Sequence, residues 1–405
     1  MLDIANRPLD VEPSDLLRAG FAATTLADGL SFSKTPVRVS SEYVENLRTL
    51  SVLLDTALRA VVARYHEDFR IRDIYALDPA LDALLGVARG SPYAVGLYRP
   101  DFVYDLDGHP RICEIGARYP LNGWMVSRAA TRSLAEALAS VGLREVCEQD
   151  APLLDALRAL HPPGTVLAML HGCEPGTELF CLRDELAAHG VEFLQAHPSA
   201  LRCSGGALAI DGRRIDRIVL EMDRTELVDF QPDALARMID EACYFNDVRT
   251  LILVHDKRVL AVLNDEAIMR DCMAADAYAA LRRYLIPTWV VHDDHDARVL
   301  QSRPHDLIAK PSSGGRGVDT CVRSLCDPAA WARCMGPDRG RYVFQEYIGQ
   351  YTFREPGSGA PIHLVGMQLC RDRHSHGPGI FRGSDEAVIN VHQGRGCIYA
   401  TGVAA

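Results

Sequence analysis

A lysine at the end of an apolar run, followed at once by a loop of small residues, is the feature that most constrains this chain. The run of residues 307–309, Leu-Ile-Ala, has strand character and ends at Lys310, after which Pro311 opens the loop SSGGRG. Such a loop can turn its backbone N–H groups, together with the lysine ammonium, toward phosphate oxygens. By itself, a glycine- and serine-rich loop after a strand is most often a simple turn. The functional interpretation therefore depends on the rest of the chain.

A second stretch, RPDFVYDLDGHPRICEIG, runs from Arg99 to Gly116 and predicts two short strands joined by a tight turn at Asp107-Gly108. Asp101 would lie on the first strand and Glu114 on the second. Carboxylates on adjacent strands can supply the hard oxygen ligands that magnesium prefers. Together with the loop after Lys310, this hairpin predicts a site for a nucleoside triphosphate and its metal ion. The chain is therefore expected to be an ATP-using enzyme.

A third stretch, YVFQEYI, is an apolar strand interrupted by Gln345-Glu346. A hinge here could offer backbone groups to an adenine edge and a carboxylate to a ribose, although a charged pair inside a strand more often marks a solvent-facing edge. The chain has neither a GxxxxGK[ST] loop nor a GxGxxG fingerprint, and the segment from Gly377 to Gly383 has the wrong spacing and a proline in its turn. GxSxG and HExxH motifs are also absent.

The pattern of apolar residues divides the chain into regions of different character. Helical spacing from Ser41 to about His66, with Ser40 or Ser41 as N-cap, predicts a long amphipathic helix, and a second helix is expected over 124–141. Between about 150 and 246, the pattern is a helix, the strand VLAML (166–170), a helix over 178–189, the strands VEFLQA and RIVLEMD, and another helix. Strands that alternate with helices predict a small parallel sheet. The run RTLILVHDK (249–257) is expected to be a strand. Further strands, LIAK, YVFQEYI and IHLVGMQLC, would form an antiparallel unit that grips a nucleotide.

Composition bounds the possible partners. The chain has 405 residues, 48% of them apolar and 24% charged, and a formal charge of -11 without any sustained basic run. Nucleic acid and anionic membrane surfaces are therefore poor partners, and a small-molecule substrate is expected. No apolar run is long enough for a membrane span and no signal peptide is recognisable, so a cytoplasmic location is expected. The twelve cysteines include no C-x-x-C pair, Cys321 and Cys326 being nearest in sequence, and are expected to be reduced, mostly buried thiols.

The order of these motifs, from about residue 95 to the C-terminus, resembles the circularly permuted ATP-grasp ligases, which include eukaryotic glutathione synthetase and the synthetase half of bacterial glutathionylspermidine synthase. The resemblance implies an α/β (α+β) ATP-grasp fold with an inserted small parallel α/β domain. It further implies three regions. Residues 1–149 would form N-terminal helices and the metal-binding strands, residues 150–255 the inserted substrate domain, and residues 256–405 the nucleotide-binding region with its glycine-rich loop and lid.

Carried over residue by residue, the resemblance makes Asp101 and Glu114 magnesium ligands and places Arg99 against the reacting carboxylate. The family's asparagine two residues after the glutamate is Gly116 here, so water or a side chain such as Asn122 would have to replace that ligand. The acidic residue that some members carry within the glycine-rich loop is also missing. The residues implied to bind ATP are Lys257, Lys310, Ser312, Ser313, Gly314, Gly315, Arg316, Gly317, Gln345, Glu346, Tyr347 and Ile348.

Several other residues have two interpretations. Arg118 and Arg382 could each hold a substrate carboxylate bidentately, although a surface arginine is the commoner fate. Without the family order, Lys257 would be taken as a solvated lysine at a strand end. The cluster His292 to Asp296 cannot converge on one ion and is expected to be a solvated turn. His374 and His376 are expected in a mobile loop.

The resemblance implies an ATP- and magnesium-dependent ligase that joins a small carboxylic acid, an amino acid or γ-glutamyl compound, to an amine through an acyl phosphate. A homodimer follows from the same precedent. Two alternatives remain open: a nucleotide-binding regulator of the same fold without ligase chemistry, which Gly116 motivates, and a phosphotransferase that forms no amide. The identities of the acid and the amine do not follow from the sequence.

Overall fold

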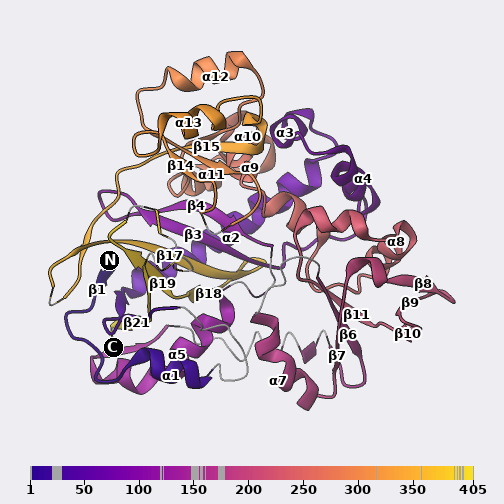
Figure 1. Ribbon diagram of the computed structural model, residues 1–405, viewed down its shortest axis with the longest axis horizontal. Coiled ribbons are helices and arrows are strands. Elements are labelled where there is room, and N and C mark those ends of the chain that lie inside the picture. The colour runs from indigo at the N-terminus through magenta and orange to yellow at the C-terminus, as the bar shows by residue number, and fades with distance from the viewer. Residues whose placement is uncertain are drawn as a thin grey trace.

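A seven-stranded sheet at the centre of the molecule joins segments that are far apart in the sequence (Figure 1). The computed structural model describes residues 2–20, 30–118, 121, 123–146, 155, 158–159, 161–171, 178–315, 317–356, 358–386, 388–389, 391, 394 and 396–404. The strand order is β20-β19-β17-β3-β4, and β16 and β18 also pair with β17. The strands are β3 (Leu97–Tyr104), β4 (Pro110–Gly116), β16 (Phe353–Arg354), β17 (Pro361–Arg371), β18 (His374–Pro378), β19 (Phe381–Ser384) and β20 (Cys397–Tyr399).

The predicted hairpin is confirmed. β3 and β4 pair antiparallel, and their register places Asp101 opposite Glu114, with an irregularity directly after Asp101. The Gly108 N–H donates to the carbonyl of Asp105, and Gly108 has a positive φ of 79°, which closes the turn at the predicted place. The two carboxylates of the sequence motif are therefore neighbours across the strand pair.

β17 is the long strand of this sheet, and both of its faces are buried. Met367 and Leu369 pack in one apolar cluster, whereas Leu364 and Cys370 pack in the other, as the two-residue period of a strand requires. Gly366 allows the close approach of neighbouring rings, since a Cβ there would lie 2.3 Å from the Tyr104 hydroxyl. The sheet is therefore a middle layer between two helical layers.

The predicted long helix is confirmed as α2 (Ser41–Arg64), which covers one face of the sheet. Ser40 caps it by accepting a hydrogen bond from the Tyr43 N–H, and its buried residues follow the helical period. The Gln368 side chain of β17 donates to the carbonyl of Leu47 at 2.6 Å. The predicted helix over 124–141 is confirmed as α5 (Trp124–Ser140), which packs in the cluster on the opposite face.

A four-stranded antiparallel sheet forms a lobe that Figure 1 shows above the central sheet. Its order is β12-β15-β13-β14, and its own core includes Leu307, Ala309 and Phe344. This confirms the strands LIAK and YVFQE. The third strand predicted for this unit, β17, lies in the central sheet instead, because its partners there are β3 and β19. The elements of the lobe are β12 (Thr288–Trp289), α12 (Asp294–Gln301), β13 (Leu307–Pro311), β14 (Cys321–Val322), α13 (Pro328–Cys334), η5 (Arg339–Arg341) and β15 (Tyr342–Glu346).

The predicted parallel sheet is confirmed, with strand order β11-β6-β7. The helix predicted over 178–189 consists of two pieces, a 3₁₀ turn and a short α-helix. A small antiparallel meander, β10-β9-β8, extends this unit. The elements are β6 (Val166–Leu170), η1 (Glu178–Leu182), α7 (Arg183–Ala188), β7 (Glu192–Ala196), η2 (Pro198–Ala200), β8 (Arg202–Ser204), β9 (Ala207–Ile210), β10 (Arg213–Arg214), β11 (Arg217–Leu220), η3 (Arg224–Asp229) and α8 (Pro232–Asp240).

The strand expected over residues 249–257 is wrong. Thr250–Val254 forms a π-helical turn (η4), and α9 (Arg258–Asn264) begins directly after Lys257. All five residues of η4 are buried, and a short apolar run that is buried on every side has no period by which a strand differs from a helix. Further helices of the described chain are α1 (Pro13–Gly20), α3 (Phe69–Tyr75), α4 (Pro79–Val87), α10 (Glu266–Cys272) and α11 (Ala275–Arg282).

The two ends of the chain meet in a four-stranded sheet of order β1-β2-β21-β5, and Figure 1 shows both termini on the same side of the molecule. Its strands are β1 (Leu2–Ile4), β2 (Val37–Val39), β5 (Leu143–Glu145) and β21 (Thr401–Ala404). β2 and β21 pair in parallel. The last strand of the chain is therefore anchored to the N-terminal segment.

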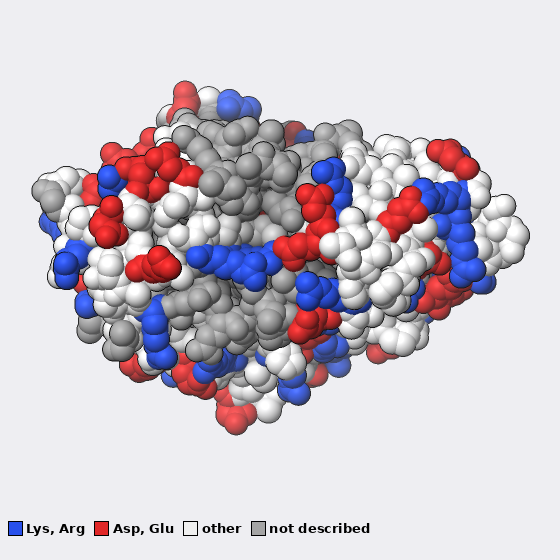
Figure 2. Space-filling model, turned by 90° about the horizontal axis from the view of Figure 1, so that it is seen from below, with Lys and Arg blue, Asp and Glu red and all other residues white. Residues whose placement is uncertain are grey.

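Two further expectations concern histidines. His374 and His376 are not in a loop but in β18, where His376 is buried against Trp124. The segment 292–296 is solvent-exposed over residues 292–295, as expected, but it is not a turn: Asp293 is the N-cap of α12, accepting from the Asp296 N–H, and residues 294–296 form the first turn of that helix. Within the described part of the chain, no helix combines the length and apolar character that crossing a membrane requires. Figure 2 shows acidic and basic side chains interspersed over the face seen from below.

Candidate active site

A pocket of about 720 Å³ lies where the β3–β4 hairpin faces the four-stranded lobe. Its lining includes most of the predicted ATP-binding residues, namely Lys257, Lys310, residues 312–315, 317 and 345–348. Asp101, Glu114 and Arg382 line it as well. Arg316 and Asn122 lie outside the described residues. Residues far apart in sequence are thus brought to one cavity, Asp101 and Arg382 being separated by 281 positions.

Lysine is rare in this chain, and most of the lysines line the pocket. The sequence contains only three lysines, and two of them, Lys257 and Lys310, line the pocket. The chain otherwise uses arginine as its cation. A lysine ammonium is a compact charge with three rotatable donors, whereas a guanidinium is a planar fork suited to fixed bidentate pairs. Two rotatable ammonium groups at one cavity can bind the oxygens of a phosphate-bearing ligand.

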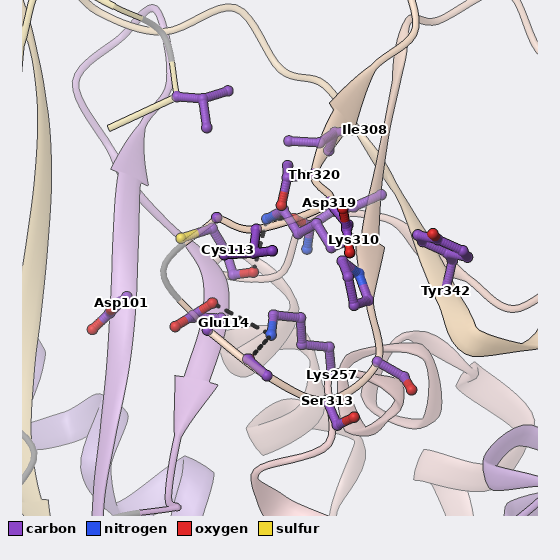
Figure 3. Close-up of a pocket in the computed structure, with 18 of the residues that line it drawn as sticks. Asp101, Cys113, Glu114, Lys257, Ile308, Lys310, Ser313, Asp319, Thr320 and Tyr342 are labelled. Atoms are coloured by element: carbon purple, nitrogen blue, oxygen red, sulfur yellow. Dashed lines mark hydrogen bonds and ion pairs between the residues drawn. The ribbon is translucent and has the colours of Figure 1, made fainter. Parts of the chain in front are cut away.

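Lys257 holds the glycine-rich loop and faces Glu114. Its ammonium donates to the carbonyl of Gly314 at 2.8 Å and lies 3.7 Å from the Glu114 carboxylate, as the dashed lines in Figure 3 show. Its backbone N–H donates to the carbonyl of Ser312. Burial alone would raise the pKa of Glu114, but the charges of Lys257, Arg99 and Lys310 outweigh it and hold the pKa at about 2. Glu114 is therefore ionised at neutral pH.

Lys310 has neutral partners. Its ammonium donates to the side-chain oxygen of Gln345 at 2.8 Å and to the carbonyl of Cys113 at 3.1 Å. Burial lowers the pKa of Lys310, and the negative charge of Glu114 opposes this. Neutral acceptors hold a cation less strongly than a carboxylate does. Lys310 can therefore exchange these partners for a more strongly charged ligand.

The loop after Lys310 depends on its glycines. Gly314 has a φ of 90° and Gly317 a φ of 66°, which residues with a side chain rarely adopt. The Ser312 N–H donates to the carbonyl of Arg341, so the start of the loop is fixed to the end of η5, directly before β15. No side chain lies within 4 Å of a Cβ built at Gly314 or Gly315, which leaves the loop open on the cavity side.

The segment 345–348 forms one wall. The Glu346 N–H donates to the carbonyl of Pro287 and the Tyr347 N–H to the carbonyl of Asp306. The next N–H, that of Ile348, has no hydrogen-bond partner among the described residues, and Ile348 lines the cavity. The buried side chain of Gln345 joins Lys310 to the Thr288 hydroxyl. The open donor at Ile348 is available to a flat, hydrogen-bonding ring.

Asp101 sits between two arginines. Arg99 donates to both of its oxygens, at 2.7 and 2.9 Å, and Arg382 donates to one of them at 2.5 Å. Asp101 and Arg99 are both buried, and Asp101 and Arg382 line the cavity, whereas Arg99 does not. Asp101 was predicted to ligate magnesium, but both of its carboxylate oxygens already accept hydrogen bonds from guanidinium groups. Glu114 is the ionised carboxylate that faces the lysines.

Arg118 lies behind the pocket rather than in its lining. Its guanidinium lies 3.6 Å from Asp223, and both belong to a cluster with His255. The His255 Nδ1 accepts a hydrogen bond from the Ala117 N–H, and burial, reinforced by Lys257, lowers the pKa of His255 to about 4. This histidine is neutral at physiological pH and contributes no charge to the site.

The sequence did not single out other lining residues. Arg224 and Arg258 both bind the buried Asp256, Arg258 at 2.6 Å, and both line the cavity. The D-x-x-E pattern of Asp223 and Glu226, a capping box, is the sequence signal that fixes η3 and hence Arg224. Asp319, also in the lining, lies two residues after the end of the glycine-rich loop at Gly317. Burial raises the pKa of the Cys113 thiol, another lining group, to about 11, so it is no ready nucleophile.

One compact group of potential metal ligands occurs among the described residues: Asp105, Asp107 and His109 at the β3–β4 turn. Their side chains are partly or fully exposed, and the Asp105 carboxylate already accepts from the backbone N–H groups of Asp107 and His109. This is the structure of a turn. The nine described cysteines that can be assessed, Cys321 and Cys326 included, are free, and three of the nine are fully buried.

The comparisons with known proteins bear on family and fold. The model of the AnkG N-terminal domain family matches residues 50–253. Among solved structures, a glutathione synthetase-like effector from Globodera pallida in its apo form is similar, with a TM-score of 0.59 at 12% sequence identity. The likeness covers 97% of this chain and 96% of that one. No curated protein matches the sequence.

Proposed function

The chain belongs to the family of the AnkG N-terminal domain, and from its glutathione synthetase-like fold and its pocket we propose that it is an ATP- and magnesium-dependent ligase of the ATP-grasp type that joins a small carboxylic acid to an amine. One observation carries the proposal. Two of only three lysines converge, from different elements, on a cavity that also contains a glycine-rich loop and an ionised carboxylate. ATP is the ligand that uses all three features.

In this proposal the lobe holds the nucleotide. The Ile348 N–H faces the adenine edge, Glu346 the ribose, and Lys257, Lys310 and the loop amides of 312–317 the phosphates. Lys310 leaves Gln345, and Lys257 leaves the Gly314 carbonyl, when the phosphates offer stronger charge-assisted hydrogen bonds. The loop, freed from Lys257, then closes over the ligand and excludes water.

Glu114 fits a magnesium ion that arrives with the nucleotide. Mg²⁺ commonly binds one or two protein carboxylates and completes its shell with phosphates and water, so a single ionised carboxylate in this position is sufficient. When bound, the ion would neutralise charge on the β- and γ-phosphates. Asp101 is assigned a different role, which is to hold Arg99 and Arg382 in place.

Two arginines are proposed to bind and orient the acid substrate. Arg382 lines the cavity and, with Arg99 behind it, provides the positive charge that orients a carboxylate beside the γ-phosphate. The carboxylate oxygen takes the γ-phosphoryl group of ATP, and ADP leaves. The amine nitrogen then attacks the acyl carbon and gives up a proton, and inorganic phosphate leaves with the original carboxylate oxygen. The same guanidinium groups stabilise the oxyanion formed in the second step. No nucleophilic side chain is required.

A regulatory nucleotide-binding protein of the same fold is the second candidate, and the engagement of Asp101 by two arginines is the observation that favours it. It would bind ATP through the same lysines but would not release ADP. Location in the cytoplasm, assembly as a homodimer and the division at about residues 150 and 255 remain proposals of the ligase hypothesis.

The test measures ADP release with ATP and magnesium against amino acids, singly and in pairs with glutamate, with products identified by mass spectrometry. The ligase predicts ADP release that depends on one pair, and a product equal to the sum of both substrates minus water. ATP binding by calorimetry without turnover for any pair would support the regulator, and a stable phosphorylated acceptor would support the phosphotransferase. Lys34→Met, at an exposed lysine that pairs with Glu12, is the matched control for Lys310→Met.

A further inference from the structure

α5 begins without a cap of its own, and a distant carboxylate supplies one. Its N-cap is Gly123, with a φ of 87° and no side chain to accept from the first turn. Glu178 of η1 accepts from the Gly123 N–H at 2.6 Å and from the Met125 N–H at 2.8 Å. Glu178 belongs to the parallel-sheet unit, and α5 packs against the central sheet. This carboxylate therefore joins the two parts of the molecule.

The start of α5 also packs against Arg99, the arginine proposed to help orient the acid substrate. A Cβ at Gly123 would lie 3.0 Å from the Nη1 of Arg99, so the guanidinium is packed against the start of α5. Burial opposes the charged form of Arg99, but Asp101, Glu114 and Glu178 outweigh it and raise its pKa. The charge of Glu178 thus acts on Arg99, whose guanidinium is bound to Asp101 in the pocket wall.

The charge acting on Glu178 comes from another element of the described chain. Arg99 of β3 is the cation whose charge acts on Glu178, and Asp101 and Glu114 act on Arg99 in turn. From α5, Arg128 is paired with Glu185 of α7 at 2.8 Å, and from β18 the His376 ring meets Trp124 at 4.8 Å. Burial raises the pKa of Glu178 to about 7, although the N–H groups of Met125 and Gly123 and the charge of Arg99 oppose this. Near neutral pH, both protonation states of Glu178 are populated.

We propose that Glu178 is a positioning residue that sets how much positive charge Arg99 presents to the acid substrate, so that binding of the acid is coupled to uptake of a proton by the Glu178 carboxylate. The proposal rests on the proposed ligase function. With Glu178 ionised, Arg99 is shared among three carboxylates and attracts another anion less. With Glu178 protonated, one of these competitors is removed. By linkage, an anion bound beside Arg99 must in turn favour the protonated form of Glu178.

The first test needs neither a variant nor turnover. In ¹H–¹⁵N NMR spectra of the full chain, the Gly123 and Met125 amide signals should titrate with a midpoint near pH 7, and addition of glutamate, as an unreactive carboxylate without ATP, should move the midpoint upward. Signals that do not titrate between pH 6 and 8, or a midpoint that glutamate leaves in place, would overturn the proposal. This readout is independent of whether the chain is a ligase.

The second test uses the ligase reaction. For the wild-type chain, KM for the acid should rise about 3- to 10-fold from pH 6 to pH 8, with kcat changing less. Glu178→Gln should keep KM low and nearly independent of pH in this range. Glu185→Gln breaks the neighbouring pair with Arg128 but does not touch α5's first N–H groups, and it should keep the wild-type profile. If Glu178→Gln retained the wild-type profile, or Glu185→Gln removed it equally, the positioning role would be refuted.

Discussion

The pocket has two ends that hold their cations in different ways. At the nucleotide end, Lys257 and Lys310 donate to neutral oxygens of Gly314, Cys113 and Gln345, and Lys257 also lies 3.7 Å from the Glu114 carboxylate. At the acid end, Arg99 and Arg382 are tied directly to a carboxylate, Asp101. A lysine can exchange a neutral hydrogen-bond partner for a phosphate oxygen, whereas separating a buried guanidinium–carboxylate pair is strongly unfavourable. The lysines are therefore suited to binding a ligand, and the arginines to a fixed geometry.

Two carboxylates show the same difference. Burial acts on both Glu114 and Glu178 in the direction that raises the pKa. Glu114 faces lysine and arginine charges, which reverse the effect and leave the pKa at about 2. Glu178 faces chiefly backbone N–H groups and one arginine, and its pKa stays at about 7. Full charges offset burial, whereas backbone dipoles do so only in part.

The largest effect is expected from breaking the acid end. Asp101→Asn leaves two guanidinium groups, one of them buried, without their carboxylate and should lower the free energy of unfolding by about 3–5 kcal/mol. Urea denaturation measures this. Asp3→Asn, which removes an exposed pair with Arg38, should cost less than about 1 kcal/mol. Weaker magnesium binding with stability intact would instead restore Asp101 as a metal ligand.

The nucleotide end should respond in binding rather than in folding. Lys310→Met removes a charge-assisted contact to phosphate and should weaken ATP binding about 10- to 100-fold, with little loss of stability. Calorimetric titration with a non-hydrolysable ATP analogue measures it. Unchanged affinity in Lys310→Met, or equal weakening in Lys34→Met, would show that this lysine does not contact the nucleotide.

Glu114→Gln tests the charge balance at the same end. Because the pKa of Glu114 is lowered in the folded chain, the stability it contributes is present above its unfolded pKa of about 4.5 and is lost as pH falls toward 2. The variant should be less stable than the wild type by about 1–2 kcal/mol at pH 7, and the difference should shrink below pH 4. A difference that stays constant from pH 7 to pH 3 would contradict the lowered pKa.

The contribution of Glu178 to stability should change with pH in the opposite direction to that of Glu114, and its size should be the smallest of the four effects. Its pKa is raised on folding, so its contribution to stability is present below about pH 4.5 and is lost as pH rises through about 7. From about pH 4.5 to 7, the free energy of unfolding of the wild type should fall by an amount on the order of 1 kcal/mol because of Glu178, and this fall should be absent in Glu178→Gln. Parallel stability–pH curves for Glu178→Gln and the wild type would contradict this sign.

Local patterns predicted the elements that have a clear period or turn. α2, the β3–β4 hairpin and the strands of the parallel sheet lie where the sequence placed them, since each is specified by residues within about one element's length. The run 249–257 failed because a fully buried apolar stretch has no polar face to reveal its period. β17 was assigned to the wrong sheet, because its pairing with β3 depends on residues far away in sequence.

The sequence by itself determined the order of the motifs, the local elements that carry them and the two lysines beside a glycine-rich loop. Only the tertiary structure decided that Asp101 meets Arg382, that Lys310 meets Gln345, and that Glu178 caps α5 beside Arg99. The physical reason is that propensity and periodicity act over a few residues, whereas hydrogen-bond partners and pKa values depend on groups that only the packed chain brings together.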